Sequence, residues 1–180
     1  LVLLTCRPHF QPAWHHRSYL TEITVNRLSQ PQVERMTTAL AGGKPLPGQV
    51  LAQITAKTDG VPLFVEELTK AVLESGMLQD VDGQYVMRGT LSSIVIPATL
   101  QDLLMARLDR LISAKGIAQL GAAIGRQFAY DLLHTVSQLD EATLQRELQR
   151  LVDAELVYQR GLPPQSSYMF KHALIQDAAY

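Results

Sequence analysis

Residues 58–76 read TDGVPLFVEELTKAVLESG and predict a well-formed helix. Pro62 suits the first helical turn, because the N–H group that it lacks would have no partner there. Apolar side chains recur every four residues on one face, at Phe64, Leu68 and Val72. Opposite charges alternate at the same spacing on another face, at Glu66, Lys70 and Glu74. Gly76 provides a natural end to the helix.

The turn Gly60-Val61-Pro62 before this helix admits two interpretations. In the first, the turn only provides a favourable start for the helix. In the second, it also forms one wall of a ligand site. The helix pattern alone favours the first interpretation and does not exclude the second, so the remainder of the chain has to decide.

The composition excludes several classes of protein. The 180 residues are 47% apolar with a formal net charge of −1, which is enough for one core or two small ones and predicts no general attraction to nucleic acid or anionic lipid. A single cysteine, Cys6, cannot form an internal disulfide and suits a reducing compartment. No apolar run approaches the length of a membrane helix, and no signal peptide is recognisable.

The first 42 residues resemble the tail of an α/β domain. Residues 1–6 form a short aliphatic run, typical of a buried strand in a parallel sheet. A Pro- and His-rich loop is expected at residues 7–19, a short edge strand at 22–28 and a helix at 32–40. The chain begins with Leu1 instead of methionine and stops within a helix-like pattern, which predicts a segment of a longer protein.

The pattern becomes mainly helical after Pro47. Helices are expected at residues 49–57, 62–75, 99–112, 114–124, 130–136 and 140–153. Asp82-Gly83 predicts a hairpin turn between residues 77–81 and 84–87, and Asp140 is a good N-cap for the helix that follows it. Two β-like runs, at 156–159 and 168–171, flank a Gly-Leu-Pro-Pro loop. Three helices followed by a hairpin is the order of a winged-helix domain, so the fold class expected is mainly α with short β elements.

Other candidate chemistries are weaker. Residues 42–44, Gly-Gly-Lys, do not match a phosphate loop. Such a loop needs two glycines at a fixed distance before the lysine and a Ser or Thr directly after it. His9, His15 and His16 cluster in a loop without acidic residues, whereas zinc sites need three or four ligands at defined spacing. The helix at 140–153 carries acids and arginines in balance, whereas a DNA-reading helix needs a clear excess of basic residues.

Two further residues are candidates for ligand contact. Arg7 follows the carboxyl end of the predicted first strand, where α/β sheets place their ligand contacts, and a guanidinium there can bind phosphate through paired hydrogen bonds. His172 follows the last β-run and precedes a helix. It is suited either to donate to a phosphate or to cap that helix.

Taken together, LVLLTCRP, DGVPLFVEELTKAVLESG and FKHALIQDAAY resemble segments of the STAND class of P-loop ATPases. The chain is most similar to the predicted ATPase region of bacterial multidomain regulators, often linked to a class III adenylate/guanylate cyclase domain. The resemblance covers essentially the whole chain. It implies the C-terminal end of a nucleotide-binding core at residues 1–42, a helical lid at 43–96, a winged-helix domain at 97–172 and the start of the next helix at 173–180.

The resemblance also implies roles for four residues. Arg7 matches the arginine after the sensor-1 strand, which monitors the γ-phosphate end. Gly60 and Pro62 match the GxP motif, whose proline packs against adenine. His172 resembles the histidine of the MHD-type motif, which reaches the ADP β-phosphate; Ala173 replaces the aspartate of that motif, so the surrounding network has to differ.

The function implied is that of a cytoplasmic, nucleotide-dependent switch segment that binds ATP or ADP. The chain contains neither a Walker A loop nor a Walker B strand end, so the resemblance implies that an upstream core holds both, together with Mg²⁺, and that this segment alone does not hydrolyse ATP. The expected partners are that core and a downstream helical-repeat region of the same chain. Nucleotide binding is also expected to drive the formation of an oligomer, whereas no membrane or nucleic acid is expected as a partner. The alternative is a winged-helix module for DNA or protein binding without nucleotide.

Overall fold

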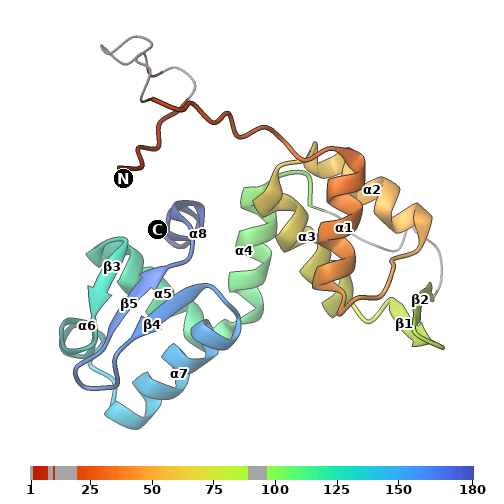
Figure 1. Cartoon of the computed structure of the whole chain (residues 1–180). Helices are drawn as coiled ribbons and strands as arrows, with labels where there is room; N and C mark the ends of the chain where they lie inside the picture. The colour runs from red at the N-terminus through yellow and green to blue at the C-terminus, as the bar shows by residue number, and fades with distance from the viewer. Residues whose placement is uncertain (1, 8–9, 11–19, 89–96) are drawn as a thin grey trace.

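The computed structural model describes residues 2–7, 10, 20–88 and 97–180, and within them the chain is mainly helical with two small antiparallel sheets (Figure 1). The fold class expected from the sequence is confirmed at this level. The elements follow in the order α1 (Gln30–Leu40), α2 (Gly48–Thr58), α3 (Pro62–Glu74), β1 (Leu78–Val81), β2 (Gln84–Met87), α4 (Leu100–Arg110), α5 (Ile112–Ile124), β3 (Gln127–Ala129), α6 (Tyr130–Ser137), α7 (Glu141–Asp153), β4 (Val157–Arg160), β5 (Ser167–Phe170) and α8 (Ala173–Ala179).

The first helical body consists of α1, α2, α3 and the β1–β2 hairpin. The apolar stripe of α3 faces its core, where Phe64, Leu68 and Val72 are all buried. Val33 of α1 and Ile54 of α2 are fully buried in the same cluster. Helix α1 therefore packs with α2 and α3. The domain boundaries expected at residues 42, 96 and 172 stay predictions.

The second helical body consists of α5 to α8 and a three-stranded sheet in the order β3-β5-β4. Its core contains Leu144 and Leu148 of α7, Ile117 of α5 and Phe170 of β5. Asp140 caps α7 as expected, because its Oδ1 accepts a hydrogen bond from the N–H of Thr143 at 2.9 Å. Folding of this body thus follows the amphipathic pattern of the sequence.

Helix α4 is shared between the two cores. Leu103 is buried in the core of the first body, whereas Leu104 and Leu108 are buried in the core of the second. Residues 103 and 104 point in different directions because neighbours on a helix are separated by about 100°. In Figure 1 the two bodies lie side by side with α4 between them.

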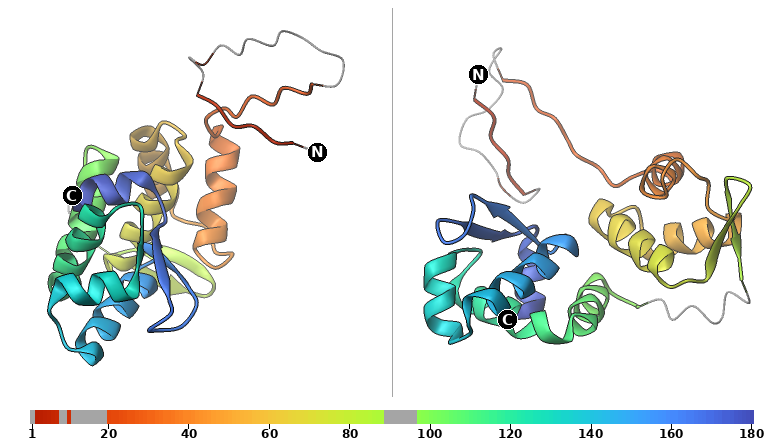
Figure 2. Two further views of the ribbon diagram at one scale, coloured as in Figure 1. Left: turned by 90° about the vertical axis from the view of Figure 1, so that its left-hand side faces the viewer. Right: turned by 90° about the horizontal axis from the view of Figure 1, so that it is seen from below.

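The strand expected at residues 1–6 was wrong for the part that is described. Residues 2–6 form no strand and are exposed, as is Arg7. A parallel strand needs hydrogen-bonded neighbours on a sheet, and within the described residues no strand pairs with this segment. The edge strand expected at 22–28 was wrong for the same reason. Residues 2–7 lie away from the helical bodies (Figure 2), whereas Leu28 at the end of the second segment packs against the first body.

The hairpin expected around Asp82-Gly83 is confirmed, with φ of 51° and 81° at the two turn residues and Val81 paired with Gln84. The strand β3 was not expected, because three residues are too few for a periodic pattern. It forms through antiparallel pairing with β5, where Phe128 lies opposite Tyr168.

Gly121 of α5 allows the ring of Phe128 to lie directly against the helix. A Cβ at this position would come within 2.7 Å of that ring, which is buried and held by Tyr168 and Phe170 at centroid distances of 5.8 and 5.7 Å. Gly121→Ala is therefore expected to lower the free energy of unfolding by about 1–3 kcal/mol through overpacking.

The matched control for this substitution is Gly116→Ala in the same helix. No atom lies within 4 Å of the Cβ that it would add, so helix propensity alone should raise stability by about 0.5–1 kcal/mol. Urea unfolding of both variants measures the difference. Equal stability of the two variants would show that the Phe128 contact is not tight.

Candidate functional site at the junction of the two helical bodies

The turn that starts α3 has a tightly constrained backbone. Asp59 and Gly60 both have left-handed conformations, with φ of 47° and 68°, and Pro62 then occupies the first turn of α3. Pro62 is exposed, while Gly60 is buried. The proline ring is thus available to a ligand, and the glycine beneath it is not.

Gly60 is required by a contact that the sequence did not reveal. The segment before α1 packs directly against Gly60, and the N–H of Leu28 donates to the carbonyl oxygen of Gly60 at 2.8 Å. A Cβ on Gly60 would lie 2.3 Å from the carbonyl oxygen of Leu28. An ion pair between Arg27 and Asp59 lies beside this contact. Packing therefore explains the glycine fully, and its role in cofactor binding stays a prediction.

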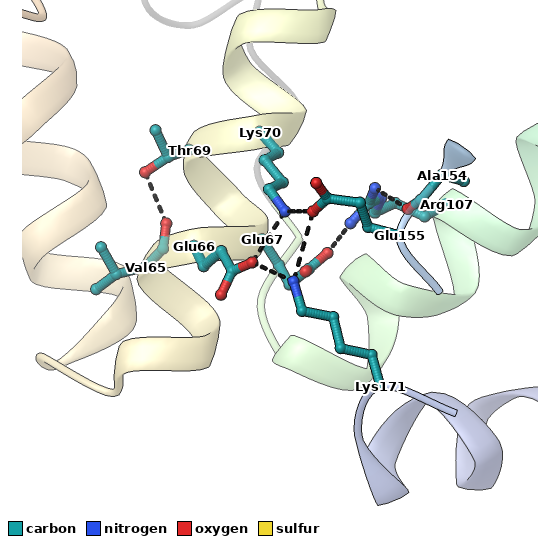
Figure 3. Close-up of polar contacts among 9 residues, drawn as sticks. All are labelled: Val65, Glu66, Glu67, Thr69, Lys70, Arg107, Ala154, Glu155 and Lys171. Carbon is teal, nitrogen blue, oxygen red and sulfur yellow. Dashed lines mark hydrogen bonds and ion pairs between the residues drawn. The ribbon is translucent and has the colours of Figure 1, made fainter. Parts of the chain in front are cut away.

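A ring of four charges joins α3 to the second body. Lys70 pairs with Glu66 on its own helix, at 2.9 Å, and with Glu155, which follows α7. Lys171, which follows β5, pairs with the same two acids, at 2.5 Å to Glu66 and 3.4 Å to Glu155. Acids and bases thus alternate around a closed ring, which we call the charge ring (Figure 3).

The charge ring shifts the pKa of Glu66, Glu155 and Lys171 in the directions that favour their charged forms. Burial raises the pKa of the Glu66 carboxyl, but the hydrogen bonds and charges of Lys171 and Lys70 outweigh burial and lower that pKa to about 2. The hydrogen bond from Lys70 lowers the pKa of Glu155. Burial lowers the pKa of Lys171, and its bonds to Glu66 and Glu155 reverse this and raise it. Glu66, Glu155 and Lys171 therefore stay charged at neutral pH.

A buried ion pair lies next to the charge ring. Arg107 of α4 donates through Nη1 to Glu67 of α3 and through Nη2 to the carbonyl oxygen of Ala154 at 2.8 Å. The exposed fractions of the Arg107 and Glu67 side chains are only 7% and 0%. Among the described residues nothing donates to Glu67 Oε1. This arginine therefore connects three segments: α3, α4 and the end of α7.

His172 follows the charge ring directly in the chain. It occupies the N-cap position of α8 with an extended backbone, φ −136° and ψ 148°, and its side chain makes no capping hydrogen bond. The imidazole is therefore not used as a helix cap. The neighbouring Lys171 connects His172 to Glu66, which lies one turn after Pro62 on the same side of α3.

Arg7 is not brought near this junction. It lies in the exposed segment 2–7, where its carbonyl oxygen accepts a hydrogen bond from the N–H of Phe10 at 2.9 Å. Figure 2 shows this segment away from both helical bodies. Of the four predicted site residues, Gly60 and Pro62 adjoin each other, and Arg7 is separate. His172 directly follows Lys171, whose partner Glu66 lies one helical turn after Pro62.

The two arginines of α7 share one carboxylate. Glu147, which is buried, pairs with Arg146 at 3.2 Å and with Arg150 at 3.1 Å and accepts a hydrogen bond from Ser113 at 2.6 Å. This bond from Ser113 is the main reason why the pKa of Glu147 is lowered. Glu147 thus offsets part of the positive charge of these two arginines, whose side chains are 59% and 49% exposed.

Other candidate sites gain no support from the described residues. His9, His15 and His16 lie outside them, and within them no group of three metal-ligating side chains gathers. A surface hollow of about 590 Å³ lies where α4, α5 and α7 meet, lined by residues that include Arg110, Ser113 and Arg150. None of the predicted site residues lines it. The junction between the bodies remains the best-defined polar site.

Lowering the pH should weaken this junction in a defined range. Because folding lowers the pKa of Glu66 from 4.5 to about 2, the stability that this group contributes is complete above about pH 5 and is lost as the pH falls towards 2. The contribution is at most about 3 kcal/mol.

Glu66→Gln provides the comparison for the acid effect, since this variant lacks the titrating group. Urea unfolding at several pH values between 7 and 2.5 should show the wild type losing its advantage over Glu66→Gln below about pH 4.5. A difference between the two proteins that stays constant down to pH 2.5 would contradict the assignment.

Comparison of the chain with models of known protein families, with curated proteins and with solved structures gave no significant match. In the part of the chain that the structure describes, every helix is too short or too polar to cross a bilayer.

Proposed function

We propose that this chain is a nucleotide-dependent switch segment of a cytoplasmic signalling ATPase, of the cyclase-linked or transcription-regulating kind. Residues 43–96, with α2, α3 and the β1–β2 hairpin, correspond to the helical lid, and residues 97–172, with α4 to α7 and the β3-β5-β4 sheet, correspond to a winged-helix domain. Helix α1 then belongs to the end of the core, and α8 starts the next helix. ADP holds the two together with an upstream nucleotide-binding core, and exchange for ATP loosens them. Phosphate and Mg²⁺ are held mainly by that core, so this segment alone is not catalytic.

The observation that carries the proposal is the ion pair between Glu66, one helical turn after Pro62, and Lys171, the residue before His172. The exposed ring of Pro62 stands at the start of the helix whose next turn carries Glu66. Glu66 pairs with Lys171, and His172 is the next residue. A nucleotide that contacts Pro62 through adenine and His172 through phosphate would therefore act on both sides of one charged junction. Arg7 would join it from the core.

Nucleic acid is not proposed as a partner of this segment. Groove binding needs basic side chains that are free to meet phosphates and bases. Helix α7 instead carries three acidic side chains against two arginines, and both arginines pair with the buried Glu147. Among the described residues, this arrangement favours the nucleotide switch over the DNA-binding alternative. The downstream partner and a nucleotide-driven oligomer remain part of the proposal.

Nucleotide binding to the natural protein, with its upstream core, tests the role of Pro62. Pro62→Ala is expected to weaken ADP binding by about tenfold, because a rigid apolar face of the adenine pocket is lost. Fluorescence titration with a labelled ADP measures the dissociation constant. His172→Ala should in turn raise the signalling output without added ATP, because a contact that holds the closed state is removed.

Pro31→Ala is the matched control for Pro62→Ala. Pro31 is also exposed and also lies in the first turn of a helix, α1. Its replacement should leave the dissociation constant unchanged. Equal ADP binding by all three proteins, together with unchanged output in His172→Ala, would remove the site assignment.

A further inference from the structure

The contacts between the two helical bodies fall into two groups of different burial. The inner group consists of the Arg107–Glu67 pair and Leu103, all at most 7% exposed. The outer group is the charge ring, whose side chains have exposed fractions from 14% for Lys171 to 54% for Glu155. The two groups adjoin, because Arg107 binds the carbonyl oxygen of Ala154, the residue before Glu155.

The two groups should respond differently to a force that separates the bodies. Separation of the inner group would leave an unpaired charge in an apolar surrounding, which is strongly unfavourable. Opening of the charge ring returns four partly exposed charges to water, where each is well solvated. The ring is therefore the weaker contact of the two, and salt should weaken it more than it weakens the buried pair.

We propose that the junction is a hinge with a releasable latch, in which Arg107, Glu67 and Leu103 form the fixed pivot and the charge ring is the latch. The chain then has a closed orientation with the ring formed and an open orientation with the ring parted and the pivot retained. Helix α4 carries the pivot, because it contributes Leu103 and Arg107 and its side chains enter both cores. This device does not depend on nucleotide, so it stands or falls separately from the function proposed above.

Alternation of charge around the ring makes the test specific. Reversing one member, as in Lys171→Glu, places a third acid beside Glu66 and Glu155. Reversing all four members, Glu66→Lys, Lys70→Glu, Glu155→Lys and Lys171→Glu, restores alternation with different residues. Lys171→Met removes one cation without introducing repulsion.

The distance between the bodies can be measured with two spin labels by pulsed electron paramagnetic resonance. Labels are placed at Ala56→Cys in α2 and Ala142→Cys in α7, both exposed. The exposed Cys6 is first replaced by serine. Circular dichroism confirms that each variant is folded before its distance distribution is compared.

The wild type should give one narrow distribution at low salt. Lys171→Glu should shift the ratio of closed to open chains at least about fivefold towards the open form, which corresponds to about 1 kcal/mol. Lys171→Met and 1 M NaCl should shift it in the same direction. The fourfold reversal should restore the narrow distribution, and Glu74→Gln, which breaks the exposed Glu74–Arg110 pair, should leave it unchanged.

Two outcomes would overturn the proposal. One is a wild-type distribution in Lys171→Glu and Lys171→Met, which would mean that the ring does not hold the bodies. The other is a fourfold reversal as open as the single reversal, which would mean that side-chain packing and not charge alternation matters. If a charge-reversed variant does not fold, Lys171→Met and the salt series decide alone.

Discussion

Replacing Arg107 by methionine is expected to lower the free energy of unfolding by about 3–5 kcal/mol. The substitution leaves Glu67 as an unpaired carboxylate whose side chain is 0% exposed. It also removes the donor to the carbonyl oxygen of Ala154. Urea unfolding at neutral pH measures the loss, which should exceed that of the other single substitutions discussed here.

A double substitution separates the charge from the packing. In Glu67→Leu/Arg107→Met both partners become apolar, and the variant should recover most of the stability, because burial of an ion pair is costly in itself. Arg110→Met is the matched control on the same helix. Its partner Glu74 is 51% exposed, so the loss should stay below about 1 kcal/mol. A double variant as unstable as Arg107→Met would contradict this explanation.

Gly60→Ala is expected to lower the free energy of unfolding by about 3 kcal/mol or more. The left-handed backbone at φ 68° costs about 1–2 kcal/mol for alanine. The new Cβ would also lie 2.3 Å from the backbone oxygen of Leu28. Leu28 would have to move, and its hydrogen bond to the carbonyl oxygen of Gly60 would be lost. Thermal and urea unfolding measure the effect.

Gly42→Ala isolates the contact with Leu28 from the backbone conformation. Gly42 has the same φ of 68°, and no atom lies within 4 Å of the Cβ that it would gain. It should therefore lose only the conformational part, about 1–2 kcal/mol. Similar losses in both variants would show that Leu28 does not press on Gly60, and the glycine of the predicted GxP motif would again need another explanation.

The sequence predicted the helices and turns because these depend on neighbours along the chain. The stripe of α3, the cap of α7 and the turn at Asp82-Gly83 are all local patterns, and the structure confirms them. The run at residues 1–6 suggested a strand from composition alone. Among the described residues it has no strand to pair with, so the prediction failed where it required a distant partner.

The junction shows the same limit. The spacing of Glu66 and Lys70 predicted their ion pair, which is present. It also predicted a pair between Lys70 and Glu74, whereas Lys70 binds Glu155 and Glu74 binds Arg110. These partners lie far away in the sequence, and no periodicity reports them. The roles of Pro62 and His172 were assigned by resemblance, while the charge ring, whose members Glu66 and Lys171 lie near them in the sequence, required the structure.

The most direct test of a nucleotide switch is the distance between the two bodies in the natural protein with ADP and with ATP. The spin labels in α2 and α7 described above provide the measurement. The proposed function predicts a narrow, closed distribution with ADP and a broader, longer one with ATP, and an open distribution with either nucleotide in His172→Ala. Identical distributions with ADP, with ATP and without nucleotide would contradict it, whatever the state of the charge ring.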